Sequence, residues 1–316
     1  MYSIQHLETI AQFWGLTLNS IHPEMDVTGS PERAEFRVVV QDNREHLYIL
    51  EQVPSASVKH KSNIIKTLRY FSEQGISAVE PYLPDLQGND IVEHNEQFWQ
   101  IVPYTQGIPL TRPGYLFEEW RGTALAHFLL EMTKQSSGLP NMSKRDVFSI
   151  KKYILDFMFR LKQHNPELLP ELTEVYMYLK KDLFRMHDTL PVAFCHGDFH
   201  VLNVIWGNKD IRKVIDWEFM GYKPELYDVA NMIGCLGMED PKGLLNGIIL
   251  TFVRELKDNH FMTLWTWRYL YEYIIALRFA WLAEWLRKKD EEMIKLEIVY
   301  IFLLIDNRRT IERIWL

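Results

Sequence analysis

The sequence predicts an α+β protein with a small, β-rich N-terminal lobe and a larger, mostly helical C-terminal lobe. The chain has 316 residues, more than one hydrophobic core usually holds, and its 47% apolar content supplies enough material for two cores. Short β-prone runs are concentrated before residue 107, whereas helical periodicity dominates after it. We therefore expect one lobe over residues 1–106 and the other over residues 107–316.

In the N-terminal lobe, apolar residues recur with helical spacing over residues 4–15, and Gly15 ends this helix. A second helix is expected over residues 62–74, where Gly75 stops it. Runs rich in β-branched and aromatic residues, separated by turn formers, predict strands over residues 35–40, 46–53 and 98–103.

The C-terminal lobe is predicted to be helical around one short hairpin. In the hairpin, the apolar runs Val204–Trp206 and Lys213–Ile215 are joined by a loop that contains Gly207, Asn208 and Asp210, residue types that turns favour. Helical periodicity predicts helices over residues 115–136, 149–163, 171–190, 224–235, 244–259, 262–288 and 290–314.

The residues that flank the hairpin carry the chemistry. Asn203 lies at its entrance and Asp216 at its exit, so antiparallel pairing is expected to bring the two side chains together. Their hard oxygen atoms suit Mg²⁺, which takes one or two protein oxygens and leaves its other positions to water and phosphate. Asp198, a few residues upstream, can accept a proton from an attacking hydroxyl.

The motif around these residues resembles that of a known enzyme family. His196-Gly197-Asp198-Phe199-His200-Val201-Leu202-Asn203 and Ile215-Asp216-Trp217-Glu218 match H-G-D-x-H-x-x-N followed by I-D-[WFP]-E. This motif is typical of the small-molecule branch of the protein-kinase-like fold, which includes aminoglycoside phosphotransferases, choline kinases, homoserine kinases and related sugar and spore-coat kinases. The clear match spans about residues 192–231.

The resemblance implies a role for each residue of the motif. Asp198 is expected to be the catalytic base, His196 to brace the loop, and Asn203 and Asp216 to bind magnesium. Asp228, in a segment that resembles P-x-x-x-D-L-A, is expected to fasten the loop through its backbone N–H groups. The N-terminal lobe would then bind the nucleotide, and the C-terminal lobe would carry the catalytic residues and the acceptor.

For the nucleotide, the resemblance implies that adenine binds to the Pro103 carbonyl and the Thr105 N–H, with the phosphates near Gly29 and Ser30. One position departs from the family, because Glu51 stands where a Lys or Arg usually holds the phosphates. Strand alternation puts Ile49 and Glu51 on the same face, toward the nucleotide. An anion there needs a neighbouring cation.

We expect this cation to come from the following helix, with Lys61 favoured over Lys59 and Lys66. In that arrangement Lys61 reaches the phosphate and pairs with Glu51. The alternative, a solvated surface lysine, stays open for each of the three residues.

The acceptor side is expected to include Trp217 and Glu218, which directly follow the predicted metal ligand, and His200 of the catalytic loop. Arg278 and Trp281 share one face of an aromatic-rich helix and are candidate acceptor contacts. The competing interpretation, an aromatic stripe that belongs to the core, is the more common case for such spacing. Arg278 among apolar neighbours predicts an anionic partner.

Composition limits the possible partners. A net charge of −7 argues against nucleic acid as a partner. We expect neither a signal peptide nor a membrane span, because residues 1–19 include His, Glu and Gln and no run of 18 apolar residues occurs. Cys195 and Cys235 are interpreted as free thiols, which favours the cytoplasm.

The predicted function is transfer of the ATP γ-phosphate, with Mg²⁺, to a hydroxyl of a small molecule such as a sugar, an amino sugar, an amino alcohol or an aminoglycoside. Two alternatives stay open: a kinase-fold scaffold without turnover, suggested by Glu51, and a metallohydrolase that uses the His and Asp residues of the loop.

Overall fold

The computed structural model describes residues 2–27, 34–139 and 147–315, which form two compact units. The first, here called the N-terminal unit, comprises Met1–Pro109, Gln135–Pro140 and Val204–Glu218. The second, the helical unit, comprises Leu110–Lys134, Asn141–Asn203 and Phe219–Leu316. Unlike the contiguous division expected from the sequence, the hairpin that begins at Val204 belongs to the N-terminal unit. The predicted α+β architecture is confirmed.

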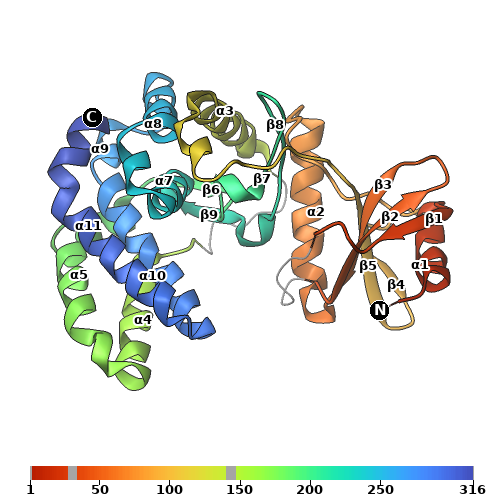
Figure 1. The fold of residues 1–316 in the computed structure, drawn as a ribbon, viewed down its shortest axis with the longest axis horizontal. Helices are drawn as coiled ribbons and strands as arrows, with labels where there is room; N and C mark the ends of the chain where they lie inside the picture. Colours follow the sequence, from red (N-terminus) through yellow and green to blue (C-terminus); the bar gives the residue numbers. More distant parts are fainter. Residues whose placement is uncertain (1, 28–33, 140–146, 316) are drawn as a thin grey trace. The chain divides into compact units, whose positions relative to one another are not determined.

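An antiparallel five-stranded sheet in the order β1-β2-β3-β5-β4 forms the centre of the N-terminal unit (Figure 1). The three predicted strands are present, and two edge strands were missed because they are short and largely polar. The strands are β1 (Leu18–His22), β2 (Phe36–Asp42), β3 (Leu47–Val53), β4 (Val92–His94) and β5 (Gln97–Pro103).

A tight turn sets the register of β2 and β3. Oδ1 of Asp42 accepts hydrogen bonds from the backbone N–H groups of Arg44 and His46, at 2.9 and 2.8 Å, and so stabilises the turn. The resulting antiparallel register pairs Arg37 with Glu51. Directly opposed side chains of this kind interact across the two strands.

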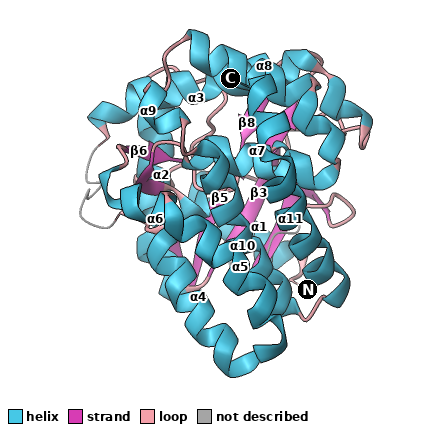
Figure 2. Ribbon diagram, turned by 90° about the vertical axis from the view of Figure 1, so that its left-hand side faces the viewer, coloured by secondary structure: helices cyan, strands magenta, loops and turns pink. Residues whose placement is uncertain are grey.

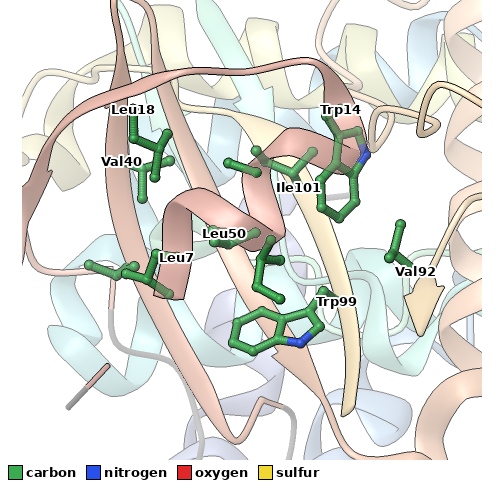
Figure 3. Packing of buried hydrophobic residues seen from close by; sticks show 11 residues of the cluster. Leu7, Trp14, Leu18, Val40, Leu50, Val92, Trp99 and Ile101 are labelled. Carbon is green, nitrogen blue, oxygen red and sulfur yellow. The ribbon is translucent and has the colours of Figure 1, made fainter. Parts of the chain in front are cut away.

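The two faces of the sheet differ in chemistry. On one face, helix α1 (Ile4–Ala11) packs over Leu50, Trp99 and Ile101, which are fully buried (Figure 3). Helix α2 (Val58–Glu73) lies on the other side of the sheet (Figure 1). Because side chains alternate along a strand, Glu51 points away from the face that carries Leu50.

The hairpin of β7 (Val204–Trp206) and β8 (Ile211–Val214) joins this unit through backbone hydrogen bonds. The Val214 N–H donates to Ala78 O at 2.8 Å, and the Ile108 N–H donates to Trp206 O at 2.8 Å. Strand β8 begins two residues earlier than the predicted run Lys213–Ile215, and its Val214 pairs with Val204 of β7.

The helical unit contains the predicted helices, two of which are interrupted. The helix expected over residues 171–190 breaks at Asp182, and the one expected over residues 262–288 breaks near Arg268. The two-stranded sheet of β6 (Val192–Cys195) and β9 (Gly221–Pro224) was not predicted. The helices are α3 (Glu119–Gln135), α4 (Ile150–His164), α5 (Leu169–Lys181), α6 (Leu183–Met186), α7 (Tyr227–Glu239), α8 (Gly247–Asp258), α9 (Leu264–Trp267), α10 (Leu270–Lys288) and α11 (Glu291–Trp315).

Helix α10 is the central element of this unit, and it packs against α4, α7 and α11 (Figure 2). Residues on several of its faces are buried, which explains why its sequence shows little amphipathic contrast. None of the helices in the described ranges is long and apolar enough to cross a membrane.

We predict that Leu50→Ala lowers the free energy of unfolding by about 2–5 kcal/mol, because the fully buried side chain leaves a cavity. Leu86 is the matched control. It belongs to the same unit and is 76% exposed, so Leu86→Ala should cost about 0.5 kcal/mol or less. Urea denaturation measures both values, and equal losses would contradict the assignment of Leu50 to the core.

Candidate active site

The loop that follows β6 holds the predicted base and depends on one glycine. Gly197 has φ +87°, and a Cβ atom on this residue would lie 1.9 Å from the backbone oxygen of Phe219. Glycine is therefore required for both the backbone angle and the close approach. The chain turns sharply here and places Asp198 directly after the turn.

Asp228, in the first turn of α7, anchors this loop. Its Oδ2 accepts the His196 N–H at 2.7 Å, and its Oδ1 accepts the Gly197 N–H at 2.9 Å. The carboxyl group is 2% exposed, and this burial raises its pKa to about 6, although the two N–H bonds act in the opposite direction. The contact expected for Asp228 is thus present.

Asp198 is held on several sides by residues of its own loop. Asn203 Nδ2 donates to the Asp198 backbone oxygen at 2.9 Å and to its Oδ2 at 3.2 Å. His200 Nε2 lies 3.6 Å from the other carboxylate oxygen, Oδ1. The Asp198 N–H donates to Nδ1 of the buried His196 at 3.2 Å. These contacts fix the orientation of the carboxylate, which is itself partly exposed.

The arrangement leaves an oxygen atom of Asn203 for another partner. Its amide nitrogen points to Asp198, so the amide oxygen is the atom of that side chain that could accept a hydrogen bond or bind a metal ion. Within the described ranges, no group of three or more His, Cys, Asp or Glu side chains suits a metal ion. This finding gives no support to the metallohydrolase alternative.

Two residues that support the loop were missed by the sequence analysis. Asn231, one helical turn after Asp228, donates to the Phe199 backbone oxygen at 3.3 Å. Lys223 on β9 is buried against the rings of Phe148 and Tyr227, at 5.4 and 5.2 Å, and burial lowers its pKa. The position of Asn231 one helical turn after Asp228 could have identified Asn231 from the sequence. No pattern in the sequence marks Lys223.

The other half of the motif belongs to the N-terminal unit. Asp216 follows β8 with φ +67°, a left-handed conformation that Asp tolerates better than most residues. Trp217 was expected to line the acceptor pocket, and this expectation is wrong. The side chain is 4% exposed, its Nε1 donates to Val214 O at 2.9 Å, and its ring packs on Phe71 of α2.

The ion pairs around Glu51 also differ from the prediction. Glu51 pairs with Arg37 of the adjacent strand, whereas Lys61 pairs with Glu218. The expected Lys61–Glu51 pair is therefore absent. Lys61 is 2% exposed, which also excludes the alternative of a solvated surface lysine. Glu218 is thereby engaged within the N-terminal unit.

The structure describes three of the other residues that are expected to contact the nucleotide, namely Ile49, Pro103 and Thr105. Pro103 ends β5, and the Tyr104 N–H donates to Leu47 O at 2.9 Å, so Thr105 lies just beyond the last strand pairing. Ile49 lies on β3 and is partly exposed. Gly29 and Ser30 fall outside the described residues.

On the helical unit, the candidate acceptor residues separate into two groups. His200 contacts Trp281, with ring centroids 6.1 Å apart, and Trp285 packs on Trp281 at 6.0 Å. Arg278 is 2% exposed and binds Glu297 of α11 through two hydrogen bonds. The predicted anionic partner thus exists. However, Arg278 is buried against Trp281, so the expected direct contact of Arg278 with the acceptor is wrong.

Comparison with known proteins identifies the family. Residues 26–258 match the phosphotransferase enzyme family. The chain belongs to this family. It is accordingly a phosphotransferase with the kinase-like fold that the sequence motif implied. No curated protein gives a significant match to the chain.

Solved structures with the same fold are distant in sequence. Amicoumacin kinase hAmiN, in complex with AMP-PNP, Ca²⁺ and Ami, is 14% identical with a TM-score of 0.70, over 97% of this chain and 94% of that one. An aminoglycoside phosphotransferase from Alicyclobacillus acidocaldarius is 14% identical with a TM-score of 0.67, over 99% and 98%. Spectinomycin phosphotransferase APH(9)-Ia, bound to AMP, is 13% identical with a TM-score of 0.67, over 96% and 99%.

We predict that Gly197→Ala destabilises the protein more than Gly75→Ala does. Both glycines have a positive φ, but nothing lies within 4 Å of a Cβ on Gly75. Gly75→Ala should cost only the conformational strain of about 1–2 kcal/mol, whereas Gly197→Ala adds the clash with Phe219. Urea denaturation compares the two, and equal losses would contradict the close approach.

The raised pKa of Asp228 predicts a pH-dependent stability. Because the folded state binds this proton more tightly than the unfolded state, the contribution of Asp228 falls as pH rises from its ordinary pKa of 3.8 to about 6. The stability advantage of wild type over Asp228→Asn should therefore shrink by about 1 kcal/mol between pH 5 and 6, and level off above pH 7.

The control for this experiment is Asp85→Asn. Hydrogen bonds from Asn89 and neighbouring N–H groups lower the pKa of Asp85, although its burial opposes them. Asp85 is therefore ionised in both states above pH 5, and its contribution should be constant from pH 5 to 8. Urea unfolding at several pH values measures both differences, and a pH-independent effect of Asp228→Asn would exclude its raised pKa.

Proposed function

We propose that this protein is an ATP- and Mg²⁺-dependent kinase that transfers the γ-phosphate to a hydroxyl group of a small molecule. One observation carries the proposal: Asp198 is partly exposed and its carboxylate is oriented by Asn203 and His200. The loop that holds it is anchored by Asp228. A carboxylate fixed in this way is suited to orient an attacking hydroxyl and to accept its proton.

The proposed division of roles follows from the chemistry of each side chain. Oδ1 of Asp198 lies on the side of His200, and Oδ2 lies on the side of Asn203. The acceptor hydroxyl would donate its hydrogen bond to this carboxylate, which takes up the proton as the oxygen attacks the γ-phosphorus, the bond from that phosphorus to the β–γ bridging oxygen breaks, and ADP leaves. His196 and Asp228 hold the backbone of the loop in place while the proton moves. Positioning supplies most of the expected rate gain.

For the metal, the available donors fit a magnesium ion. The amide oxygen of Asn203 and the carboxylate of Asp216 are hard oxygen donors, and Mg²⁺ needs only one or two of these because phosphate and water complete its shell. When bound, the ion would neutralise the charge of the phosphates. Both donors lie at the ends of the hairpin whose strands pair Val204 with Val214, and this continuity of the chain supports their shared role.

For the acceptor, the helical unit supports an aromatic binding surface next to the base. Trp281 is adjacent to His200, which is adjacent to Asp198. Indole rings bind the apolar faces of sugars and also cations, which fits a sugar, an amino sugar, an amino alcohol or an aminoglycoside. Two structural neighbours, amicoumacin kinase and spectinomycin phosphotransferase, carry names that are consistent with such acceptors.

The alternative of a kinase-fold scaffold without turnover was suggested by the unusual Glu51. The structure gives this alternative no support, because the charge of Glu51 is neutralised by Arg37. A cytoplasmic location is part of the proposal, because ATP is abundant there and both described cysteines are free thiols.

We predict that Asp198→Asn lowers kcat by about 10²–10⁴-fold, because the amide cannot accept the proton, while the Kd for Mg·ATP stays within about threefold. A coupled ADP-release assay over a panel of sugars, amino alcohols and aminoglycosides measures turnover, and calorimetry measures binding. The control is Asp188→Asn, an exposed aspartate of the same unit. Wild-type turnover in Asp198→Asn would show that another group is the base.

A further inference from the structure

A cluster of polar side chains occupies the sheet face opposite the α1 core. Glu51 is 3% exposed and forms an ion pair with Arg37. The Tyr82 hydroxyl donates to Glu51 Oε2 at 3.1 Å, and Gln100 Nε2 donates to the same atom. With these donors around it, the buried carboxylate is satisfied. It acts as a fixed anchor for the guanidinium of Arg37.

Arg37 is more open than its anchor. Its side chain is 23% exposed, against 4% for the side chain of Glu51. One terminal nitrogen, Nη1, donates to Val27 O at 3.2 Å, and Nε faces Glu51. A guanidinium has five N–H groups in a planar fork, more than these two contacts engage. Arg37 is therefore a positioned cation with donor capacity left for an oxyanion.

The electrostatic surroundings connect Arg37 with the proposed metal ligand. Burial lowers the pKa of Arg37, but the negative charges of Glu51 and, more weakly, Asp216 outweigh it, so the pKa is raised from its ordinary value. Asp216 and Arg37 belong to the same unit and act on each other there. Phosphate oxygens are suited to bind a metal ion and a guanidinium at the same time.

We propose that Arg37, oriented by Glu51, binds the nucleotide phosphates. This inference depends on the proposed kinase function. The phosphate-binding cation then lies on β2, whereas the sequence led us to expect it on the helix that follows β3. Lys61 does not fit the role, because its side chain is 3% exposed, against 23% for the side chain of Arg37. The anionic Glu51 thereby becomes a positioning residue for the cation beside it.

The test compares wild type with Arg37→Gln and with the double variant Arg37→Gln, Glu51→Gln. The single variant leaves a buried carboxylate without its cation, which costs stability. The double variant replaces the ion pair by two amides that can hydrogen-bond to each other, so it keeps the fold testable. The control is Arg69→Gln, which removes another arginine–carboxylate pair of the same unit, that with Asp90.

Calorimetry measures the Kd for Mg·ATP and for adenosine, with Mg·GTP and guanosine in parallel. Loss of charge-assisted hydrogen bonds should weaken triphosphate binding about tenfold or more in the double variant, while the Kd for the nucleoside is unchanged. Arg69→Gln should leave the ratio of the two Kd values at the wild-type level.

The outcomes separate the inference from the function on which it depends. If the double variant is folded and keeps the wild-type ratio of nucleoside to triphosphate Kd, Arg37 only joins β2 to β3 and the inference is wrong. If wild type binds neither Mg·ATP nor Mg·GTP, the proposed function fails and the inference fails with it. Thermal unfolding without nucleotide establishes that each variant is folded.

Discussion

The contact between the Asp228 carboxylate and two backbone N–H groups is the constraint on which the active loop depends. A loop that turns at Gly197 exposes amides that no strand or helix satisfies, and a buried unsatisfied amide is costly. The first turn of α7 supplies the acceptor. Because this carboxylate binds both amides, Asp198 leaves the turn in a fixed direction, and its partners within the loop need only orient the side chain.

A second constraint operates in the N-terminal unit, where two buried ion pairs bring charges of opposite sign together. Glu51 is bound by Arg37, and Lys61 is bound by Glu218. Burying any of these groups alone would be strongly unfavourable. The same pairing rule applies in the helical unit, where Arg278 binds Glu297 beneath the surface that Trp281 presents. Paired in this way, the charges orient neighbouring groups without a net burial of charge.

Local spacing in the sequence predicted much of the active loop. The roles of His196 and Asp228 in holding the loop match the observed hydrogen bonds, because these residues lie within one short stretch whose turn leaves few alternatives. The strands β2 and β3 were also predicted, but their pairing was not. The observed register pairs Arg37 with Glu51, and a symmetrical count from the turn after Asp42 was the signal that would have identified this pair in advance.

By itself, the sequence determined the fold class, the order of most elements, and the motif that marks the chain as a phosphotransferase. These features depend on periodicity and on near neighbours in the chain. Only the tertiary structure decided which charges pair and which aromatic rings are buried, as with Lys61, Arg278 and Trp217. The partner of a side chain far along the chain depends on which faces of distant elements pack together, and a single sequence does not specify that packing.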